Sequence, residues 1–299
     1  MRILCIVHVF YPEFWPELAG CLRNIDGPFD LIVTYVDETK GIPDMVRRDF
    51  PQARPLLCEN RGFDVWPFLK ALYSVDLSSY DLLVKLHTKR DVKANHSLIF
   101  NHRNYYGARW RNYLLGFMCR PADWTATKAR FADPGVGMVA DARVILRKDD
   151  VPWKTPRTTS VQAAEFVERL YGCPVPESQF VAGTMFAARP AVFGRLLAHG
   201  WKVDDFCESV RDGTEQTAHL LERVMGAVVS AEGLRIEPCH GTLAGSRFRA
   251  HVIGILRAIG LFLFDAHRVD GRLIVKVLRV SVYRGPRPGG NGSGEGDCK

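Results

Sequence analysis

Three segments of the chain hold the polar residues best suited to chemistry, and each follows a short apolar run. The first is Glu59-Asn60-Arg61-Gly62-Phe63-Asp64, in which Gly62 permits a tight turn and Asp64 opens a helical pattern. A helix N-terminus favours an anion, and a carboxylate there can accept hydrogen bonds from hydroxyls or a base edge. Asp64 can equally be an ordinary N-cap, and the sequence leaves both roles open.

The second segment is the apolar run Asp81–His87, which continues into Thr88, Lys89 and Arg90. The cationic side chains Lys85, Lys89 and Arg90, together with the histidine, can neutralise a diphosphate directly, without a metal ion. The alternative is a solvated basic turn. We favour the anion site, because the apolar strand carries a lone histidine to its tip.

The third segment combines Phe180–Phe186 with the later stretch Asp212–Arg223. Gly183 leaves room for a ligand against its strand. Glu215, His219 and Glu222 are spaced by four and then three residues, so they share one helix face. A carboxylate there can act as the general base for a hydroxyl, with Asp212, Glu215 and Glu222 as candidates. The alternative is a capped helix with a salt-bridged face.

Short β-branched runs alternate with segments of helical spacing, a pattern typical of a mostly parallel sheet flanked by helices. In such an α/β fold, ligands bind beyond the carboxyl ends of the strands. The strands are expected at Ile3–Phe10, Asp30–Val36, Arg54–Cys58, Asp81–His87, Gly137–Ala140 and Phe180–Ala187. The helices are expected at Glu13–Asn24, Pro43–Phe50, Asp64–Tyr73, within Val92–Trp124, at Val161–Tyr171, after Pro190 and at Thr214–Val229, with a loop at 149–160.

The composition is that of an ordinary globular protein, with 299 residues, 47% of them apolar and 24% charged. The eight cysteines are scattered without metal-site or disulfide spacing, which fits a reducing cytoplasm. The apolar run Ile3–Phe10 is too short for a secretory signal, and Val252–Phe264 falls short of a membrane span. We therefore expect a soluble or peripheral protein.

The basic excess lies near the C-terminus. The chain has a net charge of +7, and residues 245–287 hold eight Arg and one Lys against two Asp. One reading is an amphipathic segment on an anionic membrane, with apolar and basic positions at Arg247, Arg249, Ile253, Leu256, Arg257, Ile259, Phe262, Leu263, Arg268 and Arg272. The other is that Ile253–Phe264 packs on the core and Leu273–Tyr283 forms strands. Both stay open. Nucleic acid is not expected, because no binding motif is present, and residues 285–299 are expected to be disordered.

Taken together, the polar segments resemble the rhamnan synthesis protein F family, bacterial glycosyltransferase-like proteins from lipopolysaccharide and cell-wall polysaccharide gene sets. The resemblance covers residue 8 to about 225, in chain order. It rests on Val7-His8-Val9-Phe10-Tyr11-Pro12, Asn60–Asp64 with Pro67-Phe68, Tyr80–Lys89, Ala182–Phe186, and Asp212-Gly213-Thr214 with His219 and Glu222-Arg223.

The resemblance implies a GT-A-like fold over residues 1–244, with a Rossmann-type nucleotide-binding half at 1–91 and an acceptor and catalytic half at 92–244. A basic extension at 245–284 would follow. The implied activity is a sugar transfer, expected to invert, of rhamnose or another deoxyhexose from dTDP- or GDP-rhamnose to a polyprenyl-linked surface polysaccharide. The implied place is the cytoplasm, with a peripheral position on the inner face of the membrane as an open alternative. A non-catalytic glycan- or nucleotide-sugar-binding subunit is the rival function.

The resemblance also implies roles for individual residues. The donor would be bound by His8, Asn60, Arg61, Gly62, Asp64, Lys85, His87, Thr88, Lys89, Gly183 and Thr184, and catalysis would use Asp212, Glu215, His219 and Glu222. Many nucleotide-sugar enzymes hold a divalent cation with an Asp-x-Asp pair at the strand end that here carries His and Lys. We therefore assign no metal ligand, and a dependence on Mn²⁺ or Mg²⁺ stays open.

Overall fold

The structure is a computed structural model that describes residues 1–91, 98–100, 103–105, 107–147, 157–175, 179–207, 216–269, 272–278 and 280–284. It divides into two compact units, Met1–Ser246 and Arg247–Lys299. The division falls two residues after the boundary expected at 244. The roles assigned to the two halves of the first unit stay predictions.

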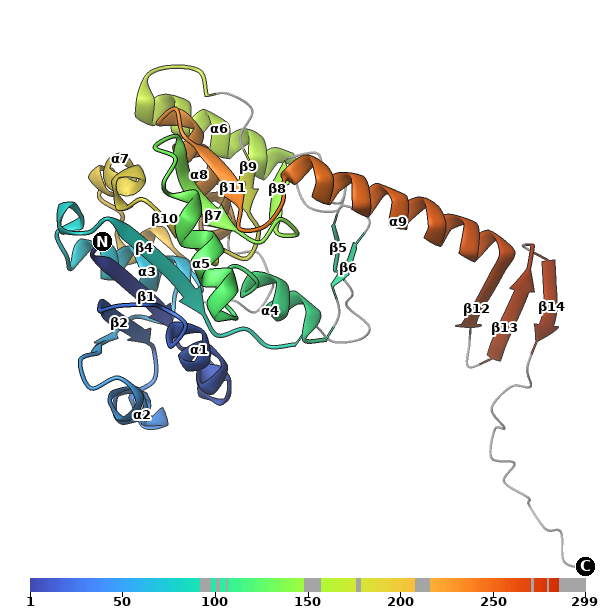
Figure 1. The fold of residues 1–299 in the computed structure, drawn as a ribbon, viewed down its shortest axis with the longest axis horizontal. Coiled ribbons are helices and arrows are strands. Elements are labelled where there is room, and N and C mark those ends of the chain that lie inside the picture. Colours follow the sequence, from blue (N-terminus) through green and yellow to red (C-terminus); the bar gives the residue numbers. More distant parts are fainter. Residues whose placement is uncertain are drawn as a thin grey trace, which may run out of the picture. The chain divides into compact units, whose positions relative to one another are not determined.

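The first unit is built on a seven-stranded sheet with the order β11-β7-β10-β4-β1-β2-β3 (Figure 1). Neighbouring strands run parallel except for β10, which is antiparallel to both β4 and β7. Strands β1, β4 and β7 are buried along their whole length, as expected for a parallel sheet covered on both faces. The strands are β1 Ile3–His8, β2 Phe29–Tyr35, β3 Arg54–Leu57, β4 Leu82–His87, β7 Val136–Ala140, β10 Phe186–Ala188 and β11 Arg235–Pro238.

Helices flank this sheet, which confirms the expected α/β class (Figure 1). Helix α3 packs against β1 and β2, α5 against β7, and α8 against β11. Three helices carry a proline in their first turn, where the missing N–H costs no hydrogen bond. The helices are α1 Trp15–Leu22, α2 Ile42–Asp49, α3 Val65–Tyr73, α4 Arg109–Leu114, α5 Pro121–Arg130, α6 Arg157–Tyr171, α7 Gly194–Ala198 and α8 Gln216–Ala231.

The helical expectation for Val92–Trp124 is wrong in its first part. Residues Leu98–Phe100 and Arg103–Tyr105 form an antiparallel hairpin, β5 and β6, and helix begins only at Arg109. Segments this short cannot meet the cost of helix nucleation, but they satisfy their backbone groups by pairing with each other. Most of the loop expected at 149–160 lies outside the described residues, and α6 begins at Arg157, four residues earlier than expected.

The single strand expected over Phe180–Ala187 is two strands separated by a turn. Strand β9, Gln179–Val181, pairs with β8, Ile145–Arg147, whereas β10 joins the main sheet. Between them Gly183 and Thr184 have φ angles of 75° and 52°, in the left-handed region that no continuous strand can contain. The turn brings polar backbone groups to the centre of the sheet. Strands β8 and β11 had no counterpart in the sequence-based expectation.

The second unit contains most of α9, Leu243–Leu263, followed by three antiparallel strands. The strands expected within Leu273–Tyr283 are confirmed as β13 and β14. Over the described part of the chain, no helix combines the length and the apolar character needed to cross a membrane. The tail at 285–299 lies outside the described residues. The strands are β12 Phe264–Val269, β13 Arg272–Val277 and β14 Val280–Arg284.

Helix α8 approaches the backbone of β9 most closely at Gly226. A Cβ atom built there would lie 2.0 Å from the carbonyl oxygen of Gln179 and 2.6 Å from the Cα of Phe180. Both atoms belong to the backbone, so neither can give way as a flexible side chain would. The absence of a side chain at Gly226 therefore sets the distance between α8 and β9.

Replacing Gly226 by alanine is expected to lower the free energy of unfolding by about 1–3 kcal/mol, because the helix must move away from β9. Urea denaturation of the purified chain measures the change. Gly20→Ala is the matched control, since Gly20 is also inside a helix but has nothing within 4 Å of its Cβ position. That control should be neutral or stabilising by about 0.5–1 kcal/mol. Equal stability of the two variants would contradict the account.

Candidate functional site

Strand register places polar side chains side by side at the carboxyl ends of β1, β2 and β4. His8 pairs with Thr34 of β2 on one side and with His87 of β4 on the other. All three are buried, and the Nδ1 of His8 lies 3.0 Å from the Oγ1 of Thr34. Because the strands are parallel, residues distant in sequence meet at the edge where α/β folds bind ligands. Two of the predicted donor-binding residues, His8 and His87, are thus brought together.

A buried ion pair between Lys85 and Asp64 lies at the centre of this edge. The Lys85 side chain is 1% exposed, and its Nζ donates to Asp64 Oδ2, to Thr184 Oγ1 at 2.7 Å and to the Thr184 carbonyl at 3.1 Å. The Thr184 hydroxyl in turn lies 2.5 Å from Asp64 Oδ2. An ammonium has three N–H donors, and all three have acceptors here. Lys85 therefore serves the protein's own groups rather than facing a ligand directly.

Asp64 occupies the N-cap position of α3, but its side chain makes no capping hydrogen bond. The carboxylate turns instead toward Lys85 and Thr184, so the ordinary capping role is excluded. Its second oxygen, Oδ1, lies 3.9 Å from His87 Nε2, and 16% of the side chain is exposed. This oxygen is the part of the ion pair that can still accept a hydrogen bond from a ligand.

The turn at Gly183 is held from two sides. His87 Nε2 lies 2.8 Å from the Gly183 carbonyl oxygen, and the Gly183 N–H donates to Glu222 Oε1 at 2.6 Å. These bonds help to hold Thr184 in a left-handed conformation, which is costly for a residue with a side chain. A second left-handed pair, Gly62 and Phe63, immediately precedes Asp64. Strained backbone therefore borders the ion pair at both ends.

The ligand space expected at Gly183 is already filled by protein. A Cβ atom there would lie 2.5 Å from Leu114 Cδ2 and 3.0 Å from Trp110 Cζ2, both in α4. At Gly62 the corresponding neighbours are Phe206 at 2.5 Å and the Cβ of Trp66 at 2.9 Å. The two glycines thus allow side chains of the protein to pack closely against the turns, and the expectation of ligand room at Gly183 is wrong.

Burial and the ion pair determine the charge states of the titratable side chains in this cluster. Burial by itself raises the pKa of Asp64, but the nearby His87 together with the charge and hydrogen bond of Lys85 outweigh burial and hold that pKa well below its ordinary value. Burial lowers the pKa of Lys85 and of His87, with the charge of Asp64 opposing in both cases. Burial also lowers the pKa of His8 to about 3. The cluster therefore holds one ion pair and neutral imidazole rings near neutral pH.

The predicted residues that follow β4 lie beside the loop after β1. The Thr88 hydroxyl accepts hydrogen bonds from the backbone N–H groups of Phe10 and Tyr11, each at 3.0 Å. Lys89 is half-buried, and no described residue accepts a hydrogen bond from its ammonium. Arg90 is exposed, lies over the ring of Tyr11 at 4.1 Å and is 3.7 Å from a Glu13 oxygen. Lys89 is thus the predicted cation most available to an anionic ligand.

The other predicted residues are less closely gathered. Arg61 makes an ion pair with Asp204 at 2.9 Å, and the ring of His219 lies 5.8 Å from that of Phe63. Glu222 is engaged with the Gly183 N–H, so it positions the turn rather than standing free as a base. Asp212 and Glu215 lie outside the described residues.

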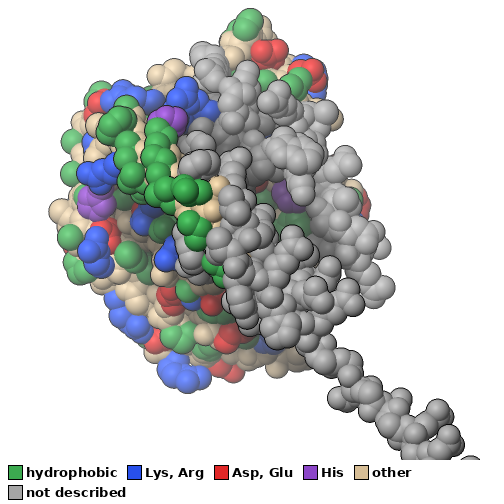
Figure 2. Space-filling model, turned by 90° about the vertical axis from the view of Figure 1, so that its right-hand side faces the viewer, with side chains coloured by type: hydrophobic (Ala, Val, Ile, Leu, Met, Phe, Trp, Pro, Cys, Tyr) green, Lys and Arg blue, Asp and Glu red, His purple; other side chains and the backbone are tan. Residues whose placement is uncertain are grey.

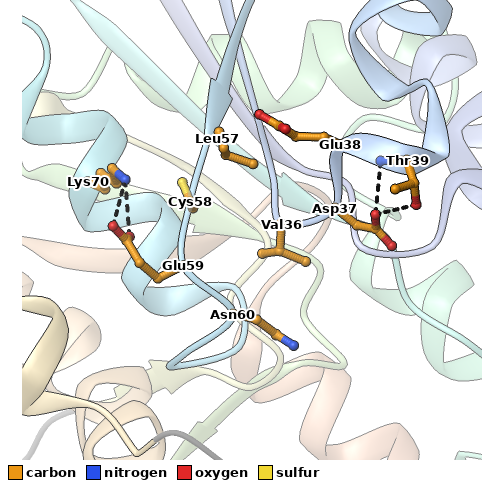
Figure 3. A pocket seen from close by; sticks show the side chains of 9 residues that line it. All are labelled: Val36, Asp37, Glu38, Thr39, Leu57, Cys58, Glu59, Asn60 and Lys70. Atoms are coloured by element: carbon orange, nitrogen blue, oxygen red, sulfur yellow. Dashed lines mark hydrogen bonds and ion pairs between the residues drawn. The ribbon is translucent and has the colours of Figure 1, made fainter.

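A pocket of about 520 Å³ opens beyond the carboxyl ends of β2 and β3 (Figure 3). Its lining includes the carboxylates of Asp37, Glu38 and Glu59, as well as the predicted residue Asn60. Glu59 is paired with Lys70, and Asp37 accepts hydrogen bonds from Thr39 (Figure 3). The sequence analysis missed Asp37 and Glu38. The signal was an acidic pair directly after a buried strand, Leu31–Tyr35.

Neither the ion-pair cluster nor the pocket gathers metal ligands. In the part of the chain that the structure describes, no group of three or more His, Cys, Asp or Glu side chains is placed to hold a metal ion. The carboxylate of Asp64, which lies beside β4, already has Lys85 as its cation. Metal dependence stays an open expectation, since two of the candidate carboxylates lie in the undescribed segment 208–215.

Breaking the ion pair is expected to destabilise the fold. Asp64→Asn and Lys85→Met should each lower the free energy of unfolding by about 3–5 kcal/mol, because each leaves a buried charge without its partner. The double variant should lose less than the sum of the two. Chemical denaturation of all four proteins measures this coupling. As a control, Asp30→Asn removes the exposed partner of Arg2 and should cost less than about 1 kcal/mol. Additive losses would contradict a direct pair.

The same pair predicts how stability changes with acidity. The folded-state pKa of Asp64 is lower than its ordinary value of 3.8, so its contribution is complete above that value and is lost as the pH falls below it. The stability difference between the native chain and Asp64→Asn should therefore stay constant above about pH 5 and shrink as the pH falls below about 4. Denaturation midpoints at a series of pH values test this, and a difference that does not change would contradict it.

Comparison with known proteins gives relatives that are longer than this chain. The chain is 29% identical over 252 residues to the uncharacterized protein WxcX of two Xanthomonas campestris pv. campestris strains. The match covers 80% of the chain but 33% of WxcX, so the chain spans about a third of the length of these relatives.

Among solved structures, the chain is similar to Staphylococcus aureus TarS residues 1–349, with a TM-score of 0.40 and 12% identity over 86% of this chain and 66% of that one. It is also similar to glucosyl-3-phosphoglycerate synthase of Mycobacterium tuberculosis, solved with Mn²⁺, UDP and glucosyl-3-phosphoglycerate. There the TM-score is 0.30, with 11% identity over 95% of this chain and 90% of the other. Neither similarity is close enough to assign a role to a residue of this chain.

The family comparison covers most of the first unit. The model of the family described as rhamnan synthesis protein F matches residues 1–234. The matched region includes all the strands of the main sheet except β11, together with the ion pair, the turn at Gly183 and the pocket. The resemblance expected from the polar segments is confirmed, and the chain belongs to the rhamnan synthesis protein F family.

Proposed function

We propose that this chain is a GT-A-like glycosyltransferase that moves a sugar from a nucleoside diphosphate donor to a growing polysaccharide. The observation that carries the proposal is the pre-ordered polar cluster at the carboxyl ends of β1 and β4, beside an acidic pocket. Membership of a family named for rhamnan synthesis supports a polysaccharide product and favours rhamnose as the sugar. A polyprenyl-linked glycan at the cytoplasmic face is the proposed acceptor.

The pocket beyond β2 and β3 is the proposed nucleoside subsite. Carboxylates are hydrogen-bond acceptors, and a ribose presents hydroxyl donors to them. Asp37, Glu38 and Asn60 lie on the side of the pocket formed by the ends of two parallel strands. Their negative charge disfavours phosphates inside the pocket itself. The phosphates must then extend away from it, toward the end of β4.

Lys89 is the proposed principal contact to the diphosphate. Its ammonium is not engaged with any described residue, and it follows directly on the buried end of β4. Lys85 and His87 act indirectly, because their hydrogen-bonding groups hold Asp64 and the turn at Gly183 in place. Asp64 Oδ1 is the group proposed to accept a sugar or ribose hydroxyl. In this arrangement Lys89 neutralises part of the diphosphate charge that a divalent ion neutralises in other enzymes.

The general base of an inverting transfer is proposed to be Asp212 or Glu215. A carboxylate must lie within reach of the acceptor hydroxyl to remove its proton. Glu222 is less suited, because Oε1 already accepts the Gly183 N–H and Oε2 lies 3.6 Å from Arg223. Glu222 and His219 are instead proposed to position the turn and its neighbours. Separate substitution of Asp212 and Glu215 by the corresponding amide distinguishes the two candidates.

The proposal predicts a specific loss of donor binding in Lys89→Ala. Removing a charged hydrogen-bond donor should weaken binding of a nucleoside diphosphate sugar by about tenfold or more while leaving stability unchanged. Isothermal titration with dTDP-rhamnose and GDP-rhamnose measures the effect. Arg48→Ala is the matched control, since Arg48 is an exposed cation on α2. Equal affinity of Lys89→Ala and the native chain would exclude the assigned diphosphate contact.

A panel of nucleotide sugars, with and without Mn²⁺ or Mg²⁺, tests the function itself. A donor at about 100 times its dissociation constant should raise the free energy of unfolding by about 2.7 kcal/mol, seen as a higher melting temperature. Transfer to a polyprenyl-linked acceptor is then measured with the donor that binds. Binding without transfer to any acceptor would favour the rival function, a non-catalytic nucleotide-sugar-binding subunit. No binding of any donor would exclude both.

A further inference from the structure

Helix α9 exposes an unusual number of large apolar side chains. Phe248 is 70% exposed and Leu256 is 62% exposed, and four further apolar residues of the helix are about half exposed. Isolated exposed leucines are common in proteins, but a contiguous group of this size marks an interaction surface. The exposed members are Phe248, Ile253, Ile255, Leu256, Ile259 and Leu263.

Five of these six residues form one stripe along α9, and Ile253 lies to one side of it. Phe248, Leu256, Ile259 and Leu263 recur at intervals that a helix of 3.6 residues per turn places on a single face. Val252, half-buried, fills the gap in the series. Figure 2 shows hydrophobic side chains gathered on one face of the molecule, with Lys, Arg and His side chains beside them. We call this set of residues on α9 the apolar stripe.

The charges of the same segment are all of one sign. Helix α9 contains Arg247, Arg249 and Arg257 and no acidic residue, and Arg249 is exposed. Over residues 245–287, eight Arg and one Lys face two Asp. A helix with one apolar face, with the exposed Arg249 and a basic local sequence, matches a surface that is apolar below and anionic above, which is the boundary of an anionic lipid bilayer.

Other occupants fit this helix less well. A second copy of the chain would cover the apolar stripe but would bring arginines against arginines, with no acidic residue in α9 to pair with them. Nucleic acid would satisfy the arginines but would leave the apolar stripe in water. A membrane span is not indicated, since α9 lacks the required apolar length.

We propose that α9 lies in the plane of an anionic membrane surface, with the apolar stripe among the acyl chains and Arg249 at the lipid phosphates. This inference does not depend on the proposed function, because a chain without transferase activity would bind lipid in the same way. If both hold, the helix keeps the enzyme at the surface where a lipid-linked acceptor is located. The two can fail separately, since one is measured with lipid and the other with nucleotide sugar.

The test is sedimentation of the full chain with lipid vesicles. We expect binding to vesicles of phosphatidylcholine mixed with phosphatidylglycerol, much weaker binding to phosphatidylcholine alone, and a decrease with added salt. Leu256→Asp should weaken binding by at least about tenfold, because a charge replaces an inserted apolar side chain. The matched control is Val161→Asp, at an apolar position on α6 that is also more than half exposed (53%), and this variant should bind like the native chain.

Arg249→Gln provides a second variant that leaves the apolar stripe intact. It should weaken binding to the anionic vesicles by about fivefold and should not change the residual binding to phosphatidylcholine. Its control is Arg48→Gln, which removes an exposed arginine on α2 and should bind like the native chain. Failure of the folded native chain to bind anionic vesicles would overturn the proposal. It would also be overturned if Leu256→Asp abolished a dimer seen by analytical ultracentrifugation while lipid binding stayed unchanged.

Discussion

A buried charge pair must have every hydrogen-bonding group satisfied, and this requirement at Asp64 and Lys85 governs the centre of the molecule. Lys85 lies inside a parallel strand, so its acceptors must come from other elements. One is supplied by α3, which begins where Asp64 can reach it. The others are supplied by Thr184, which approaches only because the chain turns sharply and returns as the antiparallel strand β10. The reversed strand and the strained turn thus supply two of the three acceptors that Lys85 requires.

The alternation of strands and helices could be predicted because apolar periodicity determines both. Strands β1, β2, β3 and β4 and helices α1, α2 and α3 begin and end close to their expected residues. The gathering of His8, Asp64 and His87 at one edge follows from the same pattern, since parallel strands align their carboxyl ends. The sequence also contains an acidic pair after β2, Asp37 and Glu38, which lines the pocket and was not recognised as a candidate.

The partners of these residues could not be predicted. An apolar run such as Phe180–Ala187 has the composition of a strand, and only the left-handed conformation of Gly183 and Thr184 reveals the turn within it. Lys85 and His87 were predicted to face a ligand, because sequence does not show whether a cation at a strand end points to solvent or to another element. In the structure both are buried and serve the protein's own groups. Such pairing depends on contacts between residues about a hundred positions apart.

The hydrogen bond from the Gly183 N–H to Glu222 links α8 directly to the turn at the centre of the sheet. The same turn is also bonded to β4, by His87 through the Gly183 carbonyl and by Lys85 through Thr184. The turn therefore connects α8 with β4. Helix α8 begins directly after the segment that carries Asp212 and Glu215. A displacement of α8 at Glu222 must therefore either break its hydrogen bond to Gly183 or move the turn that Lys85 and His87 also hold.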